Sequence, residues 1–442
     1  MEWQKETIFA VASGVGRAAV AVIRLSGPHA GATLVAMAGR LPHPRRASLT
    51  RLRDPLSGEL IDQGLALWFP APASFTGEDC VELQVHGSRA VVAAILRLLA
   101  VRHGHRLAEP GEFARRAFLN GRMDLAQIEG LADLVDSETE HQRRHALAQL
   151  DGVLGRKTEI WRGVLLQALA LIEAEIDFAD EGDAPSHVLP QIRALIGAAV
   201  MDIGAVIEKG FVAERLREGF LVVICGPPNV GKSTFLNHIA KRDVAIVSDH
   251  PGTTRDILEI FLDISGIPVR MVDTAGLRIS DNPVENQGIS KAQKYIVDAD
   301  LVLMLQDSQL SCHDQLPAAR QNLIWTVRTK SDLPEGEAFK CDFSVSSKNG
   351  AGIPNLLAEI GHLAQQCFGS GGMGEAVRER HWRILTETIA ALKRVLDCNN
   401  ATQLELVAED LRLASRSLGR VTGRIGVEDI LDEIFSRFCL GK

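Results

Sequence analysis

Apolar residues recur every three or four positions through two long proline-free stretches, residues 111–184 and 375–442. This period places apolar side chains on one face of a helix, so both stretches predict sets of long amphipathic helices. In the first stretch the periodic positions form three series: Leu125, Ile128, Leu131 and Val135; Leu147, Leu150 and Leu154; and Ile160, Val164, Ala168, Leu171 and Ile172.

The first 118 residues have a different pattern, in which short apolar runs are separated by turn residues. Strand-like runs occupy Ala19–Leu25, Leu65–Phe69 and Val81–Val85, and one clear helix covers Ala90–Ala100. Mixed strands and helices of this kind predict an α+β domain over residues 1–118.

Apolar runs alternate with helical segments in the middle of the chain, which predicts a separate α/β unit. The unit begins near Arg217 and ends before the glycine-rich segment 369–374, whose composition is that of a flexible linker. The economical topology inserts this unit, residues 217–370, between the two halves of a helical domain, residues 119–216 and 371–442. Exposed turns tolerate such insertions. We therefore expect a multidomain α/β fold, with an N-terminal α+β domain, an all-α domain and an inserted doubly wound sheet.

The most informative motif of the inserted unit is the segment Gly226-Pro-Pro-Asn-Val-Gly-Lys-Ser233, which follows the apolar run Leu221–Ile224. It matches the phosphate loop of nucleotide-binding proteins, between a strand and a helix. Its glycines allow backbone N–H groups to face phosphate oxygens, while Lys232 reaches the β- and γ-phosphates and Ser233 ligates Mg²⁺. The helix N-terminus adds a field that favours anions.

Three later segments indicate that the nucleotide is GTP. Asp273 ends the apolar run Ile267–Val272, where a carboxylate would hold Mg²⁺ through water, and Thr254 lies where a switch loop would supply a second Mg²⁺ ligand. Asp332 follows another strand-like run, and its carboxylate can accept hydrogen bonds from guanine N1–H and N2–H₂, which adenine does not offer. Such a site rejects the wrong base strongly.

These segments resemble, in order and spacing, the five motifs of translation-factor-class GTPases. That class usually has asparagine where this chain has Thr329. We expect the lost amide to loosen the bracing between loops more than it changes base choice, because Asp332 is retained. The predicted nucleotide-binding residues are Asn229, Val230, Gly231, Lys232, Ser233, Thr234, Ser248, Asp249, His250, Pro251, Gly252, Thr253, Thr254, Asp273, Thr274, Ala275, Gly276, Thr329, Lys330, Asp332, Ser346, Ser347 and Lys348.

Composition restricts the binding partners and cellular location of the protein more than its chemistry. A net charge of −8 over 442 residues excludes a broadly basic nucleic-acid clamp, so any RNA contact must be local. The seven cysteines are scattered and lack C-x-x-C spacing, which favours a reducing, cytoplasmic location. We read no signal peptide and no uncharged apolar run long enough to span a membrane. His86, His103 and His105 have no partner cysteine or carboxylate at metal-ligand spacing, so we do not expect a metal site there.

Motifs outside the inserted unit narrow the family. Ile23-Arg-Leu-Ser-Gly27, Phe75-Thr-Gly-Glu-Asp79, the segment Pro110–Asn120, Asp124-Leu-Ala-Gln-Ile-Glu129 and the terminal Phe438-Cys-Leu-Gly-Lys442 occur in this order. Together with the GTPase motifs, they resemble the MnmE (TrmE) family of tRNA uridine-modification GTPases over essentially the whole length.

The resemblance implies a function and partners that composition does not show. The N-terminal domain would bind a reduced folate, 5,10-methylene- or 5-formyl-tetrahydrofolate, and would form a homodimer. The partner would be the FAD- and NADH-dependent protein MnmG, in a heterotetramer. Together they would add an aminomethyl or carboxymethylaminomethyl group at C5 of the wobble uridine of certain tRNAs. No stable membrane association is implied.

The resemblance also assigns site residues. Arg24, Glu82, Arg122 and Lys442 would bind the folate, and Asn229, Ser248, His250 and Thr253 would hold K⁺ beside the nucleotide. Leu277 stands where many GTPases have a water-orienting glutamine, and its side chain makes no hydrogen bond, so hydrolysis needs another route. Glu285 would supply it when two GTPase domains meet face to face. Cys439 is either a nucleophile, if a nearby cation lowers its pKa, or a buried helix-end residue.

Two alternatives remain open from the residues alone. A ribosome-assembly GTPase of the Era type carries an RNA-binding KH module, whose Gly-x-x-Gly loop is matched literally by residues 423–426. The strands that such a module needs are not evident in residues 375–442. The other alternative is a one-carbon folate enzyme with GTPase regulation and no tRNA.

Overall fold

The computed structural model describes most of the chain, in two compact units that are treated separately below. One unit comprises Met1–Ala132, Gly155–Arg162 and Arg416–Lys442, and the other comprises Asp133–Leu154 and Gly163–Ser415. The described residues are 5–14, 16–177, 188–241, 245–246, 259–273, 294–307, 323–333, 340–368, 378–398, 404–425, 431, 434–435 and 441. The predicted site residues outside these ranges are Ser248, Asp249, His250, Pro251, Gly252, Thr253, Thr254, Thr274, Ala275, Gly276, Glu285, Cys439 and Lys442.

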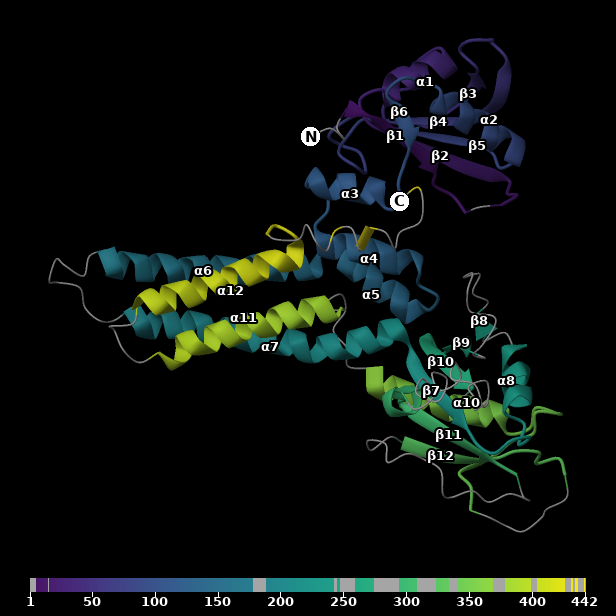
Figure 1. The fold of residues 1–442 in the computed structure, drawn as a ribbon, viewed down its shortest axis with the longest axis vertical. Coiled ribbons are helices and arrows are strands. Elements are labelled where there is room, and N and C mark those ends of the chain that lie inside the picture. The colour runs from purple at the N-terminus through teal and green to yellow at the C-terminus, as the bar shows by residue number, and fades with distance from the viewer. Residues whose placement is uncertain are drawn as a thin grey trace, which may run out of the picture. The chain divides into compact units, whose positions relative to one another are not determined.

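The first unit contains a six-stranded sheet in the order β3-β4-β5-β2-β1-β6 (Figure 1). Neighbouring strands are antiparallel except for β1 and β6, which are parallel. The three predicted strands and the predicted helix are confirmed as β2, β4, β5 and α2. The strands are β1 (Thr7–Val11), β2 (Val20–Ser26), β3 (Ser48–Arg53), β4 (Leu60–Phe69), β5 (Cys80–His86) and β6 (His105–Leu107), and the helices are α1 (Ala30–Ala38) and α2 (Arg89–Ala100).

The two faces of this sheet have different roles. Along β2 the buried Ile23 and Leu25 join a core that α1 and α2 cover together. Arg24, between them, points to the opposite face because successive side chains of a strand alternate. On that face a smaller cluster includes Ile8, Ala10 and Phe113, the last contributed by α3 (Glu112–Leu119). Helices α1 and α2 thus cover one face of the sheet, and the opposite face carries polar and aromatic side chains.

The predicted amphipathic helices are confirmed in both proline-free stretches, but three of the predicted apolar positions, Val135, Leu147 and Ile160, are exposed. In α5 the predicted Leu147 is exposed, whereas His145 and Gln149 are buried. The reason is that α5 packs against β10 and α7, so neighbouring elements and not the leucine spacing select its inner face. The helices are α4 (Leu125–Val135), α5 (Glu140–Leu150), α6 (Val153–Asp177), α7 (Val188–Glu218), α11 (Glu379–Asp397) and α12 (Leu404–Thr422).

The long helix α7 contains Leu189–Gly210, which by length and composition alone is apolar enough to cross a membrane. Its fully buried residues Ile192, Ile196 and Ile203 recur at helical spacing, and α7 packs against α11. This one-sided burial is the pattern of an amphipathic helix that packs through one face.

The second unit contains a seven-stranded sheet in the order β13-β12-β11-β7-β10-β9-β8. It is mixed and not purely parallel, because β9 runs antiparallel to both β10 and β8. Helices α8 and α10 cover one face, while Tyr295, Ile296 and Ala299 pack on the other. The strands are β7 (Phe220–Cys225), β8 (Ala245–Ile246), β9 (Glu259–Ile264), β10 (Ile267–Asp273), β11 (Leu301–Gln306), β12 (Leu323–Arg328) and β13 (Phe343–Ser344), and the helices are α8 (Lys232–Ala240) and α10 (Ile353–Phe368).

Candidate functional site

The phosphate loop connects the buried strand β7 to α8, as predicted. Gly226 has φ of +141°, and a Cβ there would lie 2.3 Å from the Leu305 carbonyl oxygen. Gly231, just before α8, has φ of +101°. Both positions therefore require glycine. The loop leads its backbone N–H groups into the N-terminus of a nine-residue helix, where a phosphate is favoured.

Polar side chains at the start of α8 converge on this loop. The Lys232 ammonium donates to the carbonyl oxygens of Gly226 and Pro227, at 2.7 and 2.8 Å, so it lies across the loop. The Ser233 hydroxyl donates to an Asp273 carboxylate oxygen at 3.0 Å. A hydroxyl and a carboxylate in contact form an oxygen donor set of the type that Mg²⁺ prefers. These two residues therefore fit the ion, whereas Thr254 lies outside the described residues.

Thr329, at the end of β12, contacts the phosphate loop directly. Its hydroxyl lies 2.8 Å from the Val230 carbonyl oxygen and 3.1 Å from that of Gln306, and the side chain is buried. The expectation of looser bracing stays a prediction, because it concerns the comparison with asparagine. The shorter threonine side chain still makes one hydrogen bond between the two loops, because the buried hydroxyl reaches a phosphate-loop carbonyl.

The predicted base-recognition residues lie together at the ends of β12 and β13. The fully buried Ser346 donates its hydroxyl to the Asp332 carboxylate at 2.6 Å, and accepts from the Lys348 backbone N–H at 3.3 Å. The hydrogen bond from Ser346 lowers the pKa of the exposed Asp332 below its ordinary value. Asp332 therefore stays ionised, the form that accepts two hydrogen bonds from a guanine edge.

Asp307 is a further residue of this region that the sequence analysis did not identify. Its carboxylate accepts from the Lys330 ammonium at 2.6 Å. The available signal was its position after β11, since ligands of α/β sheets bind outside the carboxyl ends of the strands. Asp307 holds the lysine that precedes the base-recognition aspartate by two positions.

The predicted folate residues Arg24 and Glu82 are directly opposite each other on β2 and β5. The Arg24 guanidinium donates twice to one Glu82 carboxylate oxygen, at 3.0 and 2.9 Å. It also lies 5.0 Å from the centre of the Phe75 ring and 5.7 Å from that of Phe113. An ion pair whose arginine lies near two aromatic rings offers hydrogen-bonding groups and flat apolar surfaces, which suits a planar heterocycle.

Arg122 lies close to the loop that carries Phe75, although no described hydrogen bond joins its side chain to Arg24 or Glu82. A Cβ at Gly77 would lie 3.1 Å from the Arg122 Cγ atom, so the arginine stem passes over this glycine. Arg122 itself is exposed. The third predicted folate residue is thus available to an anionic group at the border of the site.

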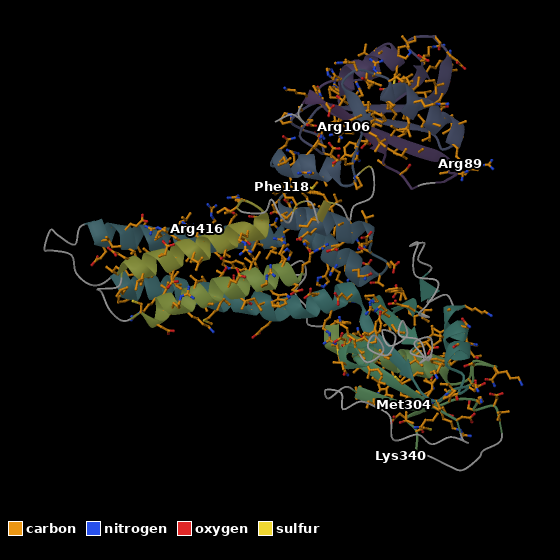
Figure 2. All side chains as sticks on the ribbon, viewed as in Figure 1. Arg89, Arg106, Phe118, Met304, Lys340 and Arg416 are labelled. Carbon is orange, nitrogen blue, oxygen red and sulfur yellow. The ribbon has the colours of Figure 1, made fainter. Side chains whose placement is uncertain are left out.

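A buried charge network beneath α3 was also missed by the sequence analysis. Arg116 is 1% exposed, and its guanidinium donates to carboxylate oxygens of Glu112 and Glu78 at 3.1 and 3.0 Å. Arg106 donates to both oxygens of Glu112, at 2.7 and 2.6 Å. Burial, the largest single influence, opposes ionisation of Glu112. The hydrogen bonds from Arg106 and from the Glu109 backbone N–H, together with the charges of both arginines, outweigh it, so the pKa of Glu112 is lowered. Figure 2 shows Arg106 within the N-terminal domain.

The end of the chain packs against the start of the same unit. Gly441 is buried with φ of +96°, and a Cβ there would lie 2.3 Å from the Val11 carbonyl oxygen of β1. In the neighbouring strand pair, Arg24 is opposite Ala10. The described part of the C-terminal segment thus contacts the strand that adjoins the Arg24 strand, while Cys439 and Lys442 lie outside the described residues.

This protein is a P-loop GTPase. The features that define the class are the mixed sheet, the phosphate loop with its two required glycines, the Ser233–Asp273 pair beside that loop, and Asp332 held by Ser346. Two solved GTPase structures are partly similar. An Aquifex aeolicus Era variant bound to GDP and aluminium fluoride is 21% identical, with a TM-score of 0.23, over 33% of this chain and 56% of that one. The G domain of T. maritima FeoB is 25% identical, with a TM-score of 0.24, over 33% and 98%.

Sequence comparisons define the family. Residues 7–122 match the model described as the GTP-binding protein TrmE N-terminus, and residues 125–439 match the MnmE helical domain. A tRNA modification GTPase MnmE of Rhodopseudomonas palustris is 49% identical over 99% of both chains. Another, of Methylorubrum populi, is 51% identical over 99% of this chain and 98% of the relative. The chain belongs to the MnmE family of tRNA modification GTPases.

Proposed function

We propose that this GTP hydrolase, whose family acts in tRNA modification, works with an FAD-dependent partner to modify C5 of the wobble uridine of certain tRNAs. The added group is aminomethyl or carboxymethylaminomethyl. The observation that carries the proposal is the joint presence of two sites in one chain: a GTPase site around Lys232, and an Arg24–Glu82 ion pair whose arginine lies near aromatic rings. The match to family members over nearly the full length supports it.

In the GTPase site, the residues of the chain position the phosphates and orient the base. The loop from Gly226 to Ser233 supplies backbone N–H groups, and Lys232 neutralises phosphate charge after exchanging its carbonyl contacts for phosphate oxygens. Ser233 and Asp273 would hold Mg²⁺, which supplies charge neutralisation to the transferring phosphoryl group. Asp332, kept ionised by Ser346, selects guanine.

The route of hydrolysis is the next part of the proposal. Asn229 is exposed in the phosphate loop with φ of +63°, accessible to a monovalent cation beside the nucleotide. Together with Ser248, His250 and Thr253, it would bind K⁺ when two GTPase domains meet, and Glu285 would then orient the attacking water. GTPase activity should rise in K⁺ over Na⁺, and Asn229→Ala should abolish that difference. Equal rates in both salts would exclude the K⁺ assignment.

Glu285 has a separate test. Glu285→Ala should lower the hydrolysis rate by about 10²–10⁴, the usual contribution of a positioned acid–base group. GTP affinity should stay near the wild-type value, because the side chain contacts water and not the nucleotide. A variant that hydrolyses GTP at the wild-type rate would remove Glu285 from the mechanism.

The N-terminal domain, residues 1–118 in the proposed division, would bind the one-carbon donor. Glu82 would pair with the donor edge of a pterin, and Arg24, Arg122 and Lys442 would bind the anionic groups of a reduced folate. Cys439 remains a candidate nucleophile. We assign the protein to the cytoplasm as a homodimer that joins MnmG in a heterotetramer, consistent with the scattered cysteines.

The decisive experiment is mass spectrometry of wobble uridine in cells that lack the gene. Loss of the C5 group, with restoration by the wild-type gene, is the expected result. The amounts of ribosome assembly intermediates should stay at the wild-type level in the same cells. This result separates the proposal from an Era-type switch. Wobble uridine that keeps its modification in the deletion strain would refute the proposal. Within the described residues after 377 there is no strand, so a KH module has no support there.

A further inference from the structure

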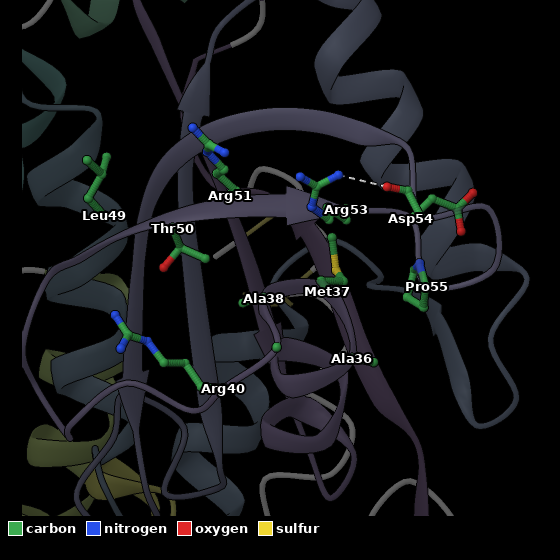
Figure 3. Close-up of a pocket in the computed structure, with 12 residues that line it drawn as sticks. Ala36, Met37, Ala38, Arg40, Leu49, Thr50, Arg51, Arg53, Asp54 and Pro55 are labelled. Carbon is green, nitrogen blue, oxygen red and sulfur yellow. Dashed lines mark hydrogen bonds between the residues drawn. The ribbon is translucent and has the colours of Figure 1, made fainter.

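A cavity of about 560 Å³ lies in the N-terminal domain between the end of α1 and the edge strand β3, and its lining includes none of the predicted site residues (Figure 3). Three arginines from two elements line it: Arg40 follows α1, and Arg51 and Arg53 belong to β3. All three side chains are exposed. The remaining wall is largely apolar, with Ala36, Met37, Ala38, Leu49 and Pro55.

The local charge contrasts with that of the whole molecule. Residues 40–53 contain five arginines and no aspartate or glutamate, although the chain has a net charge of −8. Among the described residues, Arg40 and Arg51 have no carboxylate partner, and Arg53 donates to the Gly58 carbonyl oxygen at 2.9 Å. The carboxylate in the cavity wall, Asp54, accepts from the Leu56 backbone N–H at 2.8 Å.

We propose that this arginine-lined cavity binds phosphate groups of the RNA backbone, and so is a docking site for the tRNA substrate. The proposal rests on the proposed function. A guanidinium presents planar paired donors that match two oxygens of one phosphate. Exposed cations from two elements around an open cavity suit a polymer of phosphates, whereas a small anion is usually enclosed by backbone N–H groups.

Protection of the sheet edge is the alternative explanation for part of this charge. Charged side chains on an edge strand prevent pairing with another sheet, and β3 is an edge strand. That role accounts for Arg51 and Arg53 but not for Arg40, which lies outside the strand and lines the same cavity. Arginines from two elements in the lining of one cavity are what a site for backbone phosphates requires.

The test measures binding of a fluorescently labelled, unmodified tRNA transcript to the full-length protein across a KCl series. The variant R51Q/R53Q removes two cavity charges. The matched control R89Q/R97Q removes two exposed charges from α2 in the same domain, outside the cavity. We expect R51Q/R53Q to lower affinity by about tenfold and to reduce the slope of log K against log[KCl] by about 1.4–1.8, whereas the control stays near wild type.

Other outcomes would overturn the inference. Unchanged affinity in R51Q/R53Q, or equal losses in the two variants, would show that the cavity has no specific role. Binding of inorganic phosphate to wild type but not to R51Q/R53Q, with equal transcript affinity in the two proteins, would assign the cavity to a small anion and not to RNA.

Failure of tRNA docking at this cavity can be distinguished from failure of the proposed function. If wild-type protein binds no tRNA while wobble uridine is still modified in cells, docking at this cavity is refuted and the proposed function stands. GTP hydrolysis and the thermal midpoint should be unchanged in both variants, because all four arginines are exposed, and this confirms that the variants are folded.

Discussion

At the scale of single residues, Thr329 shows how a substitution in a motif can preserve a contact. The side chain is 4% exposed, and its hydroxyl is within hydrogen-bonding distance of two carbonyl oxygens. A hydroxyl has one proton, so it donates to one carbonyl at a time or shares the proton between them. The Gln306 carbonyl already accepts from the Thr329 backbone N–H at 2.8 Å, which leaves the Val230 carbonyl as the group that depends on this hydroxyl.

Thr329→Val should therefore weaken GTP binding while keeping the side-chain shape. The lost hydrogen bond contributes about 1 kcal/mol, equivalent to roughly a fivefold change in affinity. Titration with a fluorescent GTP analogue measures the change. Thr329→Ser retains the hydroxyl and should bind close to wild type. Equal affinity in the valine and wild-type proteins would show that the contact does not brace the phosphate loop.

At the scale of elements, the buried charges of α3 attach this helix to the sheet. Arg116 contacts carboxylates of Glu112 in its own helix and Glu78 in the loop before β5. Arg116→Leu would leave both carboxylates without this buried guanidinium, so we expect unit 1 to lose about 3–5 kcal/mol of unfolding free energy. Urea denaturation measures it. Arg89→Leu, at an exposed position, should cost little, and similar losses in both variants would contradict the network's role.

The helix α5 provides a pH-dependent prediction. His145 is buried, and its Nδ1 atom has no hydrogen-bond partner among the described residues. Burial lowers the pKa of this imidazole, and the nearby His141 lowers it further. The unfolded chain takes up a proton near pH 6.5, whereas the folded unit does so only at lower pH. The stability contributed by neutral His145 is therefore present above about pH 6.5 and is lost as the pH falls below it.

His145→Gln should reduce the loss of unfolding free energy that accompanies the fall in pH. Urea denaturation of the full-length protein at about pH 7.5 and 5.5 gives the change in unfolding free energy of the second unit. His362→Gln serves as the control, because His362 is exposed and on α10. An unaltered pH dependence in the His145 variant would show that another group is responsible.

At the scale of the whole molecule, the two ends of the chain meet within one unit. Gly441 lies against Val11, and Phe435 lies against Gly111, where a Cβ would come within 2.6 Å of the Phe435 carbonyl oxygen. Deletion of residues 439–442 should weaken reduced-folate binding and abolish tRNA modification, while GTP hydrolysis continues. Calorimetric folate titration and a GTPase assay measure the two activities.

A milder variant tests the same contact without removing Cys439 or Lys442. Gly441→Ala introduces a Cβ that would lie 2.3 Å from the Val11 carbonyl oxygen, so the terminal segment must move away from β1. Folate affinity should fall with the GTPase rate unchanged. Unchanged folate affinity in both variants, with normal circular dichroism, would refute a shared site at the chain ends.

The sequence alone determined the features that depend on local geometry. The phosphate loop was predictable because φ values such as those of Gly226 and Gly231 are open mainly to glycine, and its spacing follows from the strand–loop–helix connection. The long helices were predictable because their apolar positions repeat every 3.6 residues. By contrast, α1 consists of small and apolar residues on all sides and has no period to detect.

Tertiary structure decided which side chains meet across the chain. The Arg116–Glu78 pair spans 38 positions, and the Thr329–Val230 hydrogen bond spans 99, so no local pattern predicts either. The inner face of α5 depends on what packs against it, which is why His145 is buried and Leu147 is exposed. Likewise, Arg40 reaches the cavity of Arg51 and Arg53 only because α1 packs beside β3. Burial and long-range pairing are properties of the folded chain, and periodicity does not encode them.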